Sequence, residues 1–290
     1  MKKRLNIIGC GNLAKTLAHL WAKQGVFEIG DILNRSEKSA TTAVEFIGAG
    51  QVVSSIDNLH HADVYLIATP DTHIVEMCHS LATSGTLQTG DIVFHCSGAL
   101  SSSELNAAVQ KGAMLASIHP VKSFADPEMA ISTFKGTFCG EEGNEQALSV
   151  LRPAFEAIGG LTFSVDPDHK MIYHAASVIV CNYLTALLEV GIQTYAKAGI
   201  DRDTAMKIMQ PIVTGTVDNV FKLGTTQALT GPIARGDAST VEHHLKSLSE
   251  WNNEVADIYR NLGCVTLDLS QKQGNASEDS LLALKKLLEH

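Results

Sequence analysis

The stretch Leu5-Asn6-Ile7-Ile8-Gly9-Cys10-Gly11-Asn12-Leu13-Ala14 decides the fold of the first half of this chain. An apolar run that ends at a glycine and leads into the apolar segment from Leu13 to Ala22 predicts a strand, a tight turn and a helix. The two glycines let the backbone approach a pyrophosphate, and Ala14 lets the helix pack close to the sheet. Free N–H groups at the helix start favour an anion. The pattern predicts a dinucleotide-binding loop made of Gly9, Cys10, Gly11, Asn12, Leu13 and Ala14.

Short β-rich runs alternate with helical segments as far as Val165, which is typical of an α/β Rossmann domain with a parallel sheet covered on both faces. We expect strands at residues 5–8, 27–33, 64–68, 92–95, 114–118, 137–139 and 161–165. Ser101 followed by Glu104 fits a capping box, and Asp71 is a candidate N-cap. From His169 to Lys286 only helical periodicities remain. The predicted domains are therefore residues 1–166 (α/β) and 167–287 (all-α), and residues 288–290 resemble an expression-tag remnant.

Composition limits the classes of partner. The 290 residues carry 22 Lys and Arg against 31 Asp and Glu, a net charge of −9 that disfavours nucleic acid and anionic membranes as partners. Small molecules are the expected ligands. The chain opens without an apolar signal region, so we expect a cytoplasmic protein. The most apolar stretch, Ala175 to Val190, contains Asn182 and is predicted to be a buried helix rather than a membrane span.

The segment Asn34-Arg35-Ser36 follows the second predicted strand, where an NAD-specific site usually carries an acid for the ribose 2′-hydroxyl. Arg35 offers a charged fork to a 2′-phosphate, and Ser36 adds a hydroxyl. Asp31 is the competing acid, but Ile32 and Leu33 after it place it inside the strand. The cofactor predicted from Asn34, Arg35 and Ser36 is NADP(H), with NAD(H) less favoured. The alternative for Arg35 is an ordinary solvated arginine at a helix start.

Several motifs together resemble the Rossmann-like oxidoreductases whose C-terminal part is domain of unknown function 2520. They are the glycine loop, Asn34-Arg35-Ser36, Ala68-Thr69-Pro70-Asp71, His95-Cys96-Ser97-Gly98-Ala99, His119-Pro120-Val121-Lys122-Ser123-Phe124 and Leu229-Thr230-Gly231-Pro232-Ile233-Ala234-Arg235-Gly236-Asp237. The first motifs are also similar to those of pyrroline-5-carboxylate reductase, deazaflavin-dependent NADP reductase, prephenate dehydrogenase and β-hydroxyacid dehydrogenases. They specify the cofactor rather than the substrate.

The resemblance implies a helical second domain like that of 6-phosphogluconate dehydrogenase, which commonly builds a homodimer. It also implies that Ala68, Thr69 and Pro70 border the nicotinamide ribose. Hydroxyacid dehydrogenases carry a catalytic lysine four residues before an asparagine on the first helix of that domain. Here the asparagine would be Asn182, and Val178 occupies the lysine position. His174, Val178 and Asn182 are expected to share one helical face.

Polar residues directly after strands are the catalytic candidates, because ligands of open α/β sheets bind at the carboxyl ends of the strands. His95 and Ser97 follow one strand, and His119 and Lys122 follow another. A histidine with a pKa near neutrality can give a proton to the atom that becomes negative as hydride arrives. We favour His119 as this acid, with His95 and Ser97 orienting the substrate. The alternative is that either histidine only hydrogen-bonds the loop backbone.

In the second domain, Arg235 lies in a polar loop and could hold a substrate carboxylate, or could instead contact Asp237. The pairs His60-His61 and His243-His244 lack metal-ligand spacing, so no metal site is predicted. The chain is thus interpreted as an NADP(H)-dependent reductase or dehydrogenase of a small carboxylate-bearing carbonyl or imine compound. The rival hypothesis is a non-catalytic NADP-binding sensor or regulatory protein.

Overall fold

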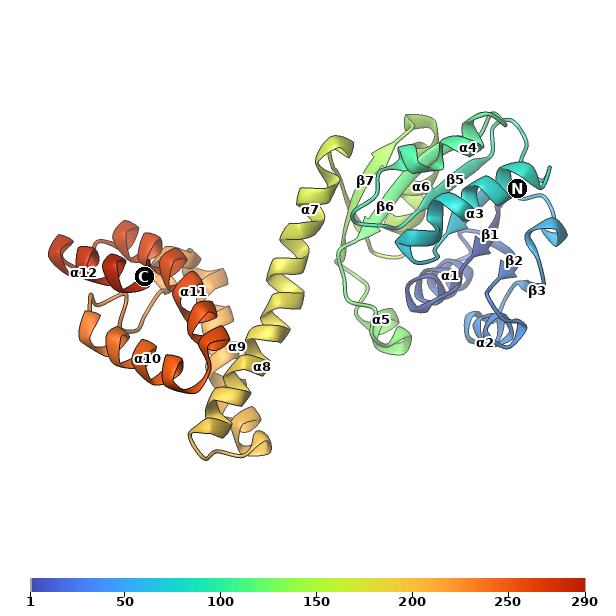
Figure 1. The fold of residues 1–290 in the computed structure, drawn as a ribbon. Helices are drawn as coiled ribbons and strands as arrows, with labels where there is room; N and C mark the ends of the chain where they lie inside the picture. Colours follow the sequence, from blue (N-terminus) through green and yellow to red (C-terminus); the bar gives the residue numbers. More distant parts are fainter. Residues whose placement is uncertain (1, 290) are drawn as a thin grey trace. The chain divides into compact units, whose positions relative to one another are not determined.

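A computed structural model describes residues 2–289, and its ribbon is drawn in Figure 1. By its contacts the chain forms two compact units, residues 1–182 and 183–290, which are treated separately. The division falls at Asn182 rather than at the predicted Asp166, because the first turns of the expected helical domain pack on the sheet. Of the suggested tag remnant, His290 lies outside the described residues.

The first unit contains one eight-stranded sheet with strand order β3-β2-β1-β4-β5-β6-β7-β8. The strands are β1 (Arg4–Ile8), β2 (Glu28–Leu33), β3 (Gln51–Val53), β4 (Val64–Ile67), β5 (Ile92–His95), β6 (Met114–Pro120), β7 (Phe138–Gly143) and β8 (Leu161–Ser164). The order 3-2-1-4-5-6 is that of a dinucleotide-binding Rossmann sheet, so the α/β prediction is confirmed. The prediction of an all-parallel sheet is wrong at one strand, because β7 pairs antiparallel with β6.

Helices cover both faces of this sheet (Figure 1). Side chains of α1, α2 and α6 form one apolar core with the sheet, and those of α3 and α4 form the other. Trp21 is fully buried in the first core, where its indole N–H donates to the Ala154 carbonyl at 2.9 Å. The helices are α1 (Asn12–Gln24), α2 (Glu37–Ile47), α3 (Asp71–Thr83), α4 (Asn106–Val109), α5 (Pro127–Ser132) and α6 (Glu145–Ala157).

Short 3₁₀ turns connect these elements at Ile56–Asn58, Ser102–Leu105 and Pro167–His169. The predicted capping box is wrong, because the Ser101 side chain makes no cap hydrogen bond and instead meets the Ser103 hydroxyl. Asp71 is the first residue of α3 rather than its N-cap, which is Pro70.

The helical segment that follows the sheet begins with α7 (Lys170–Ser177), passes through a π-helical turn (Val178–Asn182) and continues as α8 (Tyr183–Lys197). Residues 167–197 are long and apolar enough to cross a membrane by length and composition, with mean hydropathy 1.7, although one such helix is weak evidence for a span. The prediction of a buried helix at this segment is wrong for the single chain, because only 6% of its most apolar 18-residue window is buried.

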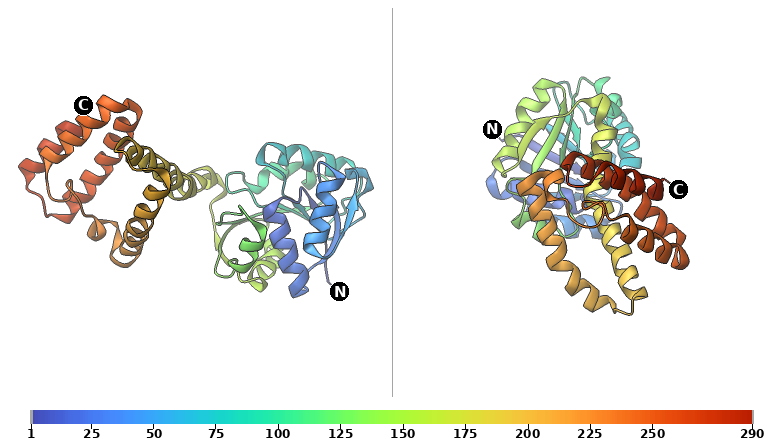
Figure 2. Two further views of the ribbon diagram at one scale, coloured as in Figure 1. Left: turned by 90° about the horizontal axis from the view of Figure 1, so that it is seen from below. Right: turned by 90° about the vertical axis from the view of Figure 1, so that its left-hand side faces the viewer.

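The second unit is entirely helical, as predicted for the C-terminal region (Figure 2). Besides α8 it contains α9 (Arg202–Ala228), α10 (Ala238–Trp251), α11 (Asn253–Gln273) and α12 (Glu278–Leu288). Its small core joins Ile233, Val241, Leu245, Leu284 and Leu288. Leu288 is 3% exposed, and its side chain lies 2.5 Å from the position of a Cβ on Gly263.

Candidate functional site

The glycine loop joins β1 to α1 and leaves its backbone open. Gly9 has φ +86°, and a Cβ there would lie 2.7 Å from Thr69, so only glycine fits against the end of β4. Gly11 has no atom within 4 Å of its Cβ position. It is the N-cap of α1 and supplies no side-chain hydrogen bond. The first N–H groups of α1 are therefore free to bind an anion.

The other residues of the loop hold its shape. The Cys10 backbone N–H donates to the Asn34 side-chain oxygen, and burial raises the pKa of the Cys10 thiol to about 12. The Asn12 side chain donates to the carbonyls of Phe124 and Ala125 at 3.0 Å each. Leu13 is half-buried and Ala14 is fully buried against the sheet. Asn12 thus ties the loop after β6 to the start of α1.

The end of β2 presents a cation rather than an acid. Arg35 is exposed, and Ser36 caps α2 by accepting the Ser39 N–H at 3.3 Å. Asp31 is fully buried. Its carboxylate accepts from the Gln51 amide at 2.7 Å and from the Arg4 guanidinium at 3.3 Å. Asp31 is therefore occupied by structural contacts and is not placed to bind a ribose hydroxyl.

Ala68, Thr69 and Pro70 follow β4, which neighbours β1 in the sheet. Thr69 lies beside Gly9, and its hydroxyl is buried without a hydrogen-bond partner among residues 2–289. Buried hydroxyls are normally paired, so this one is available to a ligand at the loop.

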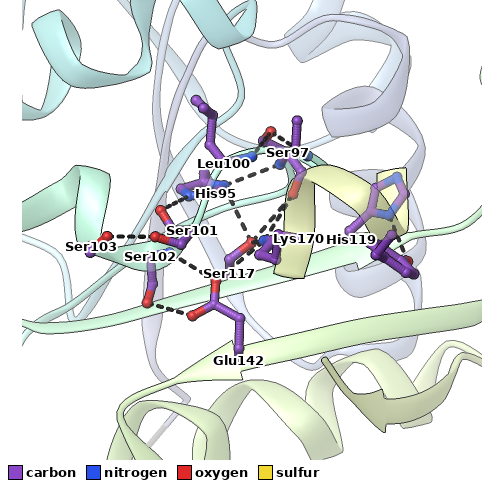
Figure 3. A network of polar contacts seen from close by, with 12 residues as sticks. His95, Ser97, Leu100, Ser101, Ser102, Ser103, Ser117, His119, Glu142 and Lys170 are labelled. Carbon is purple, nitrogen blue, oxygen red and sulfur yellow. Dashed lines mark hydrogen bonds and ion pairs between the residues drawn. The ribbon is translucent and has the colours of Figure 1, made fainter. Parts of the chain in front are cut away.

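One row of polar side chains crosses the sheet. The register places His95 of β5 opposite Ser117 of β6, and Ser117 opposite Glu142 of β7. Lys170, the first residue of α7, is 2% exposed and reaches this row. Its ammonium donates to Ser117 Oγ at 2.5 Å, to Glu142 Oε1 at 3.2 Å and to the Ser97 carbonyl at 3.2 Å (Figure 3). All three donors are used, so Lys170 ties α7 to β6, to β7 and to the loop after β5.

His95 and Ser97, the residues predicted to orient the substrate, make hydrogen bonds inside this network. His95 is fully buried, its Nε2 donates to the Ser101 carbonyl at 3.1 Å, and its Nδ1 accepts from the Ser97 N–H. Burial lowers the pKa of His95 to about 4. Ser97 Oγ donates to Asp71 at 2.7 Å and accepts from the N–H groups of Ala99 and Leu100. Both side chains shape the loop after β5.

His119 lies at the end of β6 and retains a free ring nitrogen. Its Nδ1 is 2.9 Å from the Tyr173 hydroxyl, and its Nε2 has no hydrogen-bond partner within residues 2–289. The ring packs edge-on against His174, with centroids 5.8 Å apart. A Cβ on Gly98 would lie 2.5 Å from His174 Nδ1 and 2.8 Å from His119, so the loop after β5 reaches both rings only as glycine. Burial, with the nearby His174 and Lys170, lowers the pKa of His119 to about 4.

Of the other predicted catalytic residues, Lys122 and Asn182 of the first unit make no hydrogen bond with this cluster among residues 2–289, and Arg235 belongs to the second unit. Lys122 donates to the Thr133 carbonyl at 3.1 Å. Asn182 is exposed, and twelve residues of helix put it roughly 18 Å along the axis from Lys170. A π-helical turn from Val178 to Asn182 follows the α-helix that carries His174. Arg235 is exposed in the second unit. Hydrogen bonds from Thr240, with a smaller contribution from the Arg235 charge, lower the pKa of Asp237, the N-cap of α10.

Residues 2–289 contain no group of three or more His, Cys, Asp or Glu side chains suited to a metal ion. The paired histidines instead make separate contacts: His60 with Asp31, His61 with Asp91, and His244 with Tyr259.

Sequence reasoning missed Lys170, Tyr173, Ser117 and Glu142 as parts of the site. Lys170 stands four residues before His174, a spacing that places both on one helical face. This spacing, directly after Asp166-Pro167-Asp168, is the sequence signal that could have identified Lys170 as part of the site. The hydroxyacid dehydrogenase pattern would place a lysine at position 178, which is a valine here. The lysine of this cluster, Lys170, lies eight residues before that position.

Comparison with known proteins confirms the resemblance drawn from the motifs. Residues 1–120 match the family model of the Rossmann-like domain, and residues 137–266 match that of domain of unknown function 2520. No curated protein matches the chain.

Among solved structures, protein TM1727 of Thermotoga maritima is 27% identical with a TM-score of 0.74, over 93% of this chain and 99% of that one. BF3122 of Bacteroides fragilis, described as a candidate NADP oxidoreductase, is 20% identical with a TM-score of 0.73, over 93% and 98%. A pyrroline-5-carboxylate reductase of Coxiella burnetii is 17% identical with a TM-score of 0.59, over 99% of both chains. These similarities show a shared fold.

Proposed function

We propose that the protein is an NADP(H)-dependent oxidoreductase that transfers hydride to or from a small carboxylate-bearing carbonyl or imine compound. The observation that carries the proposal is the pairing of two features at one edge of the sheet: the open glycine loop with its uncapped helix, and His119 with a free Nε2 at the end of β6. The names of the similar solved structures support the same class of chemistry.

The residues present fit a dinucleotide. Gly11 leaves space for a pyrophosphate, Thr69 offers an unpaired hydroxyl, and Arg35 is exposed after β2. When bound, NADPH supplies the hydride. His119 Nε2 then donates a hydrogen bond or a proton to the substrate oxygen or nitrogen. Lys170 and His95 hold the loops that place His119, since neither has a donor left for substrate.

We expect NADPH to bind more tightly than NADH, with Arg35 carrying the difference. Arg35→Gln should weaken NADPH binding about 10- to 100-fold, the value of a charge-assisted hydrogen-bonded pair, and leave NADH binding unchanged. Calorimetry of both cofactors with the wild type and the variant measures this. Lys111→Gln, an exposed lysine in the turn after α4, is the matched control for loss of one positive charge. Equal affinities of the wild type for the two cofactors would overturn the 2′-phosphate assignment.

Turnover separates this proposal from the regulatory alternative. Keto acids and cyclic imines are screened for oxidation of NADPH by the purified protein. If no compound is reduced while NADPH changes the affinity for a protein partner, the sensor hypothesis replaces the enzyme.

We also propose a homodimer built through the helical region. Large apolar side chains are exposed along α7, the π-helical turn and α8, including Ile172 (68%), Ile179 (58%) and Val180 (66%), and Phe221 of α9 is 86% exposed. Exposed apolar side chains in such number favour an interface with another chain.

Light scattering is expected to give twice the 31.0 kDa mass of one chain at micromolar concentration. Val180→Glu should shift the mass to that of a single chain, because a charge in an apolar interface is costly to bury. Val75→Glu, at a 50% exposed position on α3, should leave the mass unchanged. A wild-type mass near 31 kDa would contradict the dimer.

A further inference from the structure

We propose that the Tyr173 hydroxyl fixes His119 in the tautomer whose Nε2 carries the hydrogen, so that His119 meets the substrate as a neutral hydrogen-bond donor. The tautomer follows from the geometry alone. The role toward a substrate rests on the proposed function.

The direction of the Tyr173 hydrogen bond follows from what surrounds the hydroxyl. Tyr173 Oη lies 2.8 Å from the position of a Cβ on Gly140, which also faces the Val165 methyl group. His119 Nδ1 at 2.9 Å is its only hydrogen-bond partner among residues 2–289. A hydroxyl has a single hydrogen, and on this half-buried side chain Nδ1 is the acceptor within its reach. Tyr173 therefore donates to Nδ1, and the imidazole hydrogen is on Nε2.

The charges around His119 keep its ring neutral. On α7 it faces Tyr173, His174 and the Lys170 ammonium, and on α3 it faces Asp71. Lys170 and His174 disfavour a second proton on His119, while Asp71, whose charge favours it, is exposed and already accepts from Ser97. Burial raises the pKa of Tyr173 to about 12, so the hydroxyl keeps its hydrogen.

The reaction that this arrangement allows balances without a further group. A bound dinucleotide would supply the hydride that forms a C–H bond at the substrate carbon as the C=O or C=N π bond breaks. The oxygen or nitrogen that gains negative charge takes the hydrogen bond, and then the proton, from His119 Nε2. Tyr173 keeps its hydrogen and its hydrogen bond to Nδ1 throughout, and solvent returns a proton to Nε2 after the product leaves. Each turnover consumes one hydride and one solvent proton.

The direct test is the tautomer itself, read by long-range ¹H–¹⁵N correlation of the full chain with ¹⁵N-labelled histidine. His119→Gln identifies the His119 signals by their loss. We expect the Nε2–H pattern, unchanged between pH 5.5 and 8. Tyr173→Phe keeps the ring and removes only the hydroxyl, and should turn the pattern into a mixture of tautomers. An Nδ1–H pattern in the wild type, or a titration near pH 6.5, would overturn the proposal.

A chemically matched pair supplies the control. In the second unit, His244 Nδ1 lies 3.0 Å from the Tyr259 hydroxyl. Tyr259→Phe should alter the His244 signals and leave those of His119 unchanged. This comparison separates the loss of one hydrogen bond from a general disturbance of the protein.

With a substrate in hand, the kinetics test the role. Tyr173→Phe should lower kcat about 10-fold, the effect of losing a fixed donor, with KM and the NADPH dissociation constant unchanged. His119→Gln, which keeps a neutral N–H donor, should retain at least about 10-fold more activity than His119→Ala. Equal activities of the Gln and Ala variants would refute the neutral donor. Failure to find any substrate would defeat the proposed function and leave the tautomer result standing.

Discussion

Replacing Lys170 by methionine is expected to destabilise the protein by about 3–5 kcal/mol, because it leaves the buried Glu142 carboxylate without its positive partner. The side chains of Lys170 and Glu142 are 2% and 5% exposed, and their charged atoms lie 3.2 Å apart. Methionine fills a similar volume, so little of the loss comes from packing. Since domains are stable by only about 5–15 kcal/mol, urea unfolding of the variant should show a large fall in midpoint.

The double variant Lys170→Met/Glu142→Gln tests the electrostatic cause. It removes both charges and keeps an oxygen that accepts the Ser102 N–H, which Glu142 now accepts at 2.8 Å. We expect it to recover roughly 2 kcal/mol relative to Lys170→Met, since replacing a buried ion pair as a unit is far less costly than breaking it. Equal midpoints for the single and double variants would show that Lys170 acts through packing instead.

The elements that bind a dinucleotide could be predicted because each is encoded locally. A four-residue apolar run, two glycines and an apolar helix are contiguous from Leu5 to Ala22, and the structure forms β1, the loop and α1 there. The three-residue strand β3 was missed because it is too short for any alternation. The antiparallel direction of β7 was also missed, since apolar periodicity does not encode strand direction.

The chemical environment of the site could be predicted only in part. Position after a strand identified His95 and His119 equally, although one is fully buried and the other has a free nitrogen. The difference is made by contacts across long separations in the chain, such as Lys170 with Ser117 and Tyr173 with His119. No local pattern carries these pairings. The expected near-neutral pKa of His119 was wrong for the same reason. Burial lowers this pKa, and burial is set by the fold rather than by the local sequence.

His119→Ala is expected to lower kcat about 10²- to 10⁴-fold while NADPH affinity changes little, because it removes the donor and no structural contact of the glycine loop. His95→Ala should do the opposite. Its ring is fully buried with both nitrogens paired, so its loss should cost about 2–5 kcal/mol of stability through a cavity and unpaired loop groups. Rate, cofactor dissociation constant and melting temperature are measured for both variants.

The pH dependence completes this comparison. Burial has lowered the pKa of His119 to about 4, below its ordinary value of 6.5, so the folded state binds a proton less readily than the unfolded chain. The contribution of neutral His119 to the free energy of unfolding is therefore fully present above pH 6.5. It is lost as the pH falls toward 4. For the same reason kcat should show no histidine titration between pH 6 and 8. If activity rises steeply as the pH falls through 6.5, or if His95→Ala abolishes turnover in a protein that melts normally, the donor is not a neutral His119.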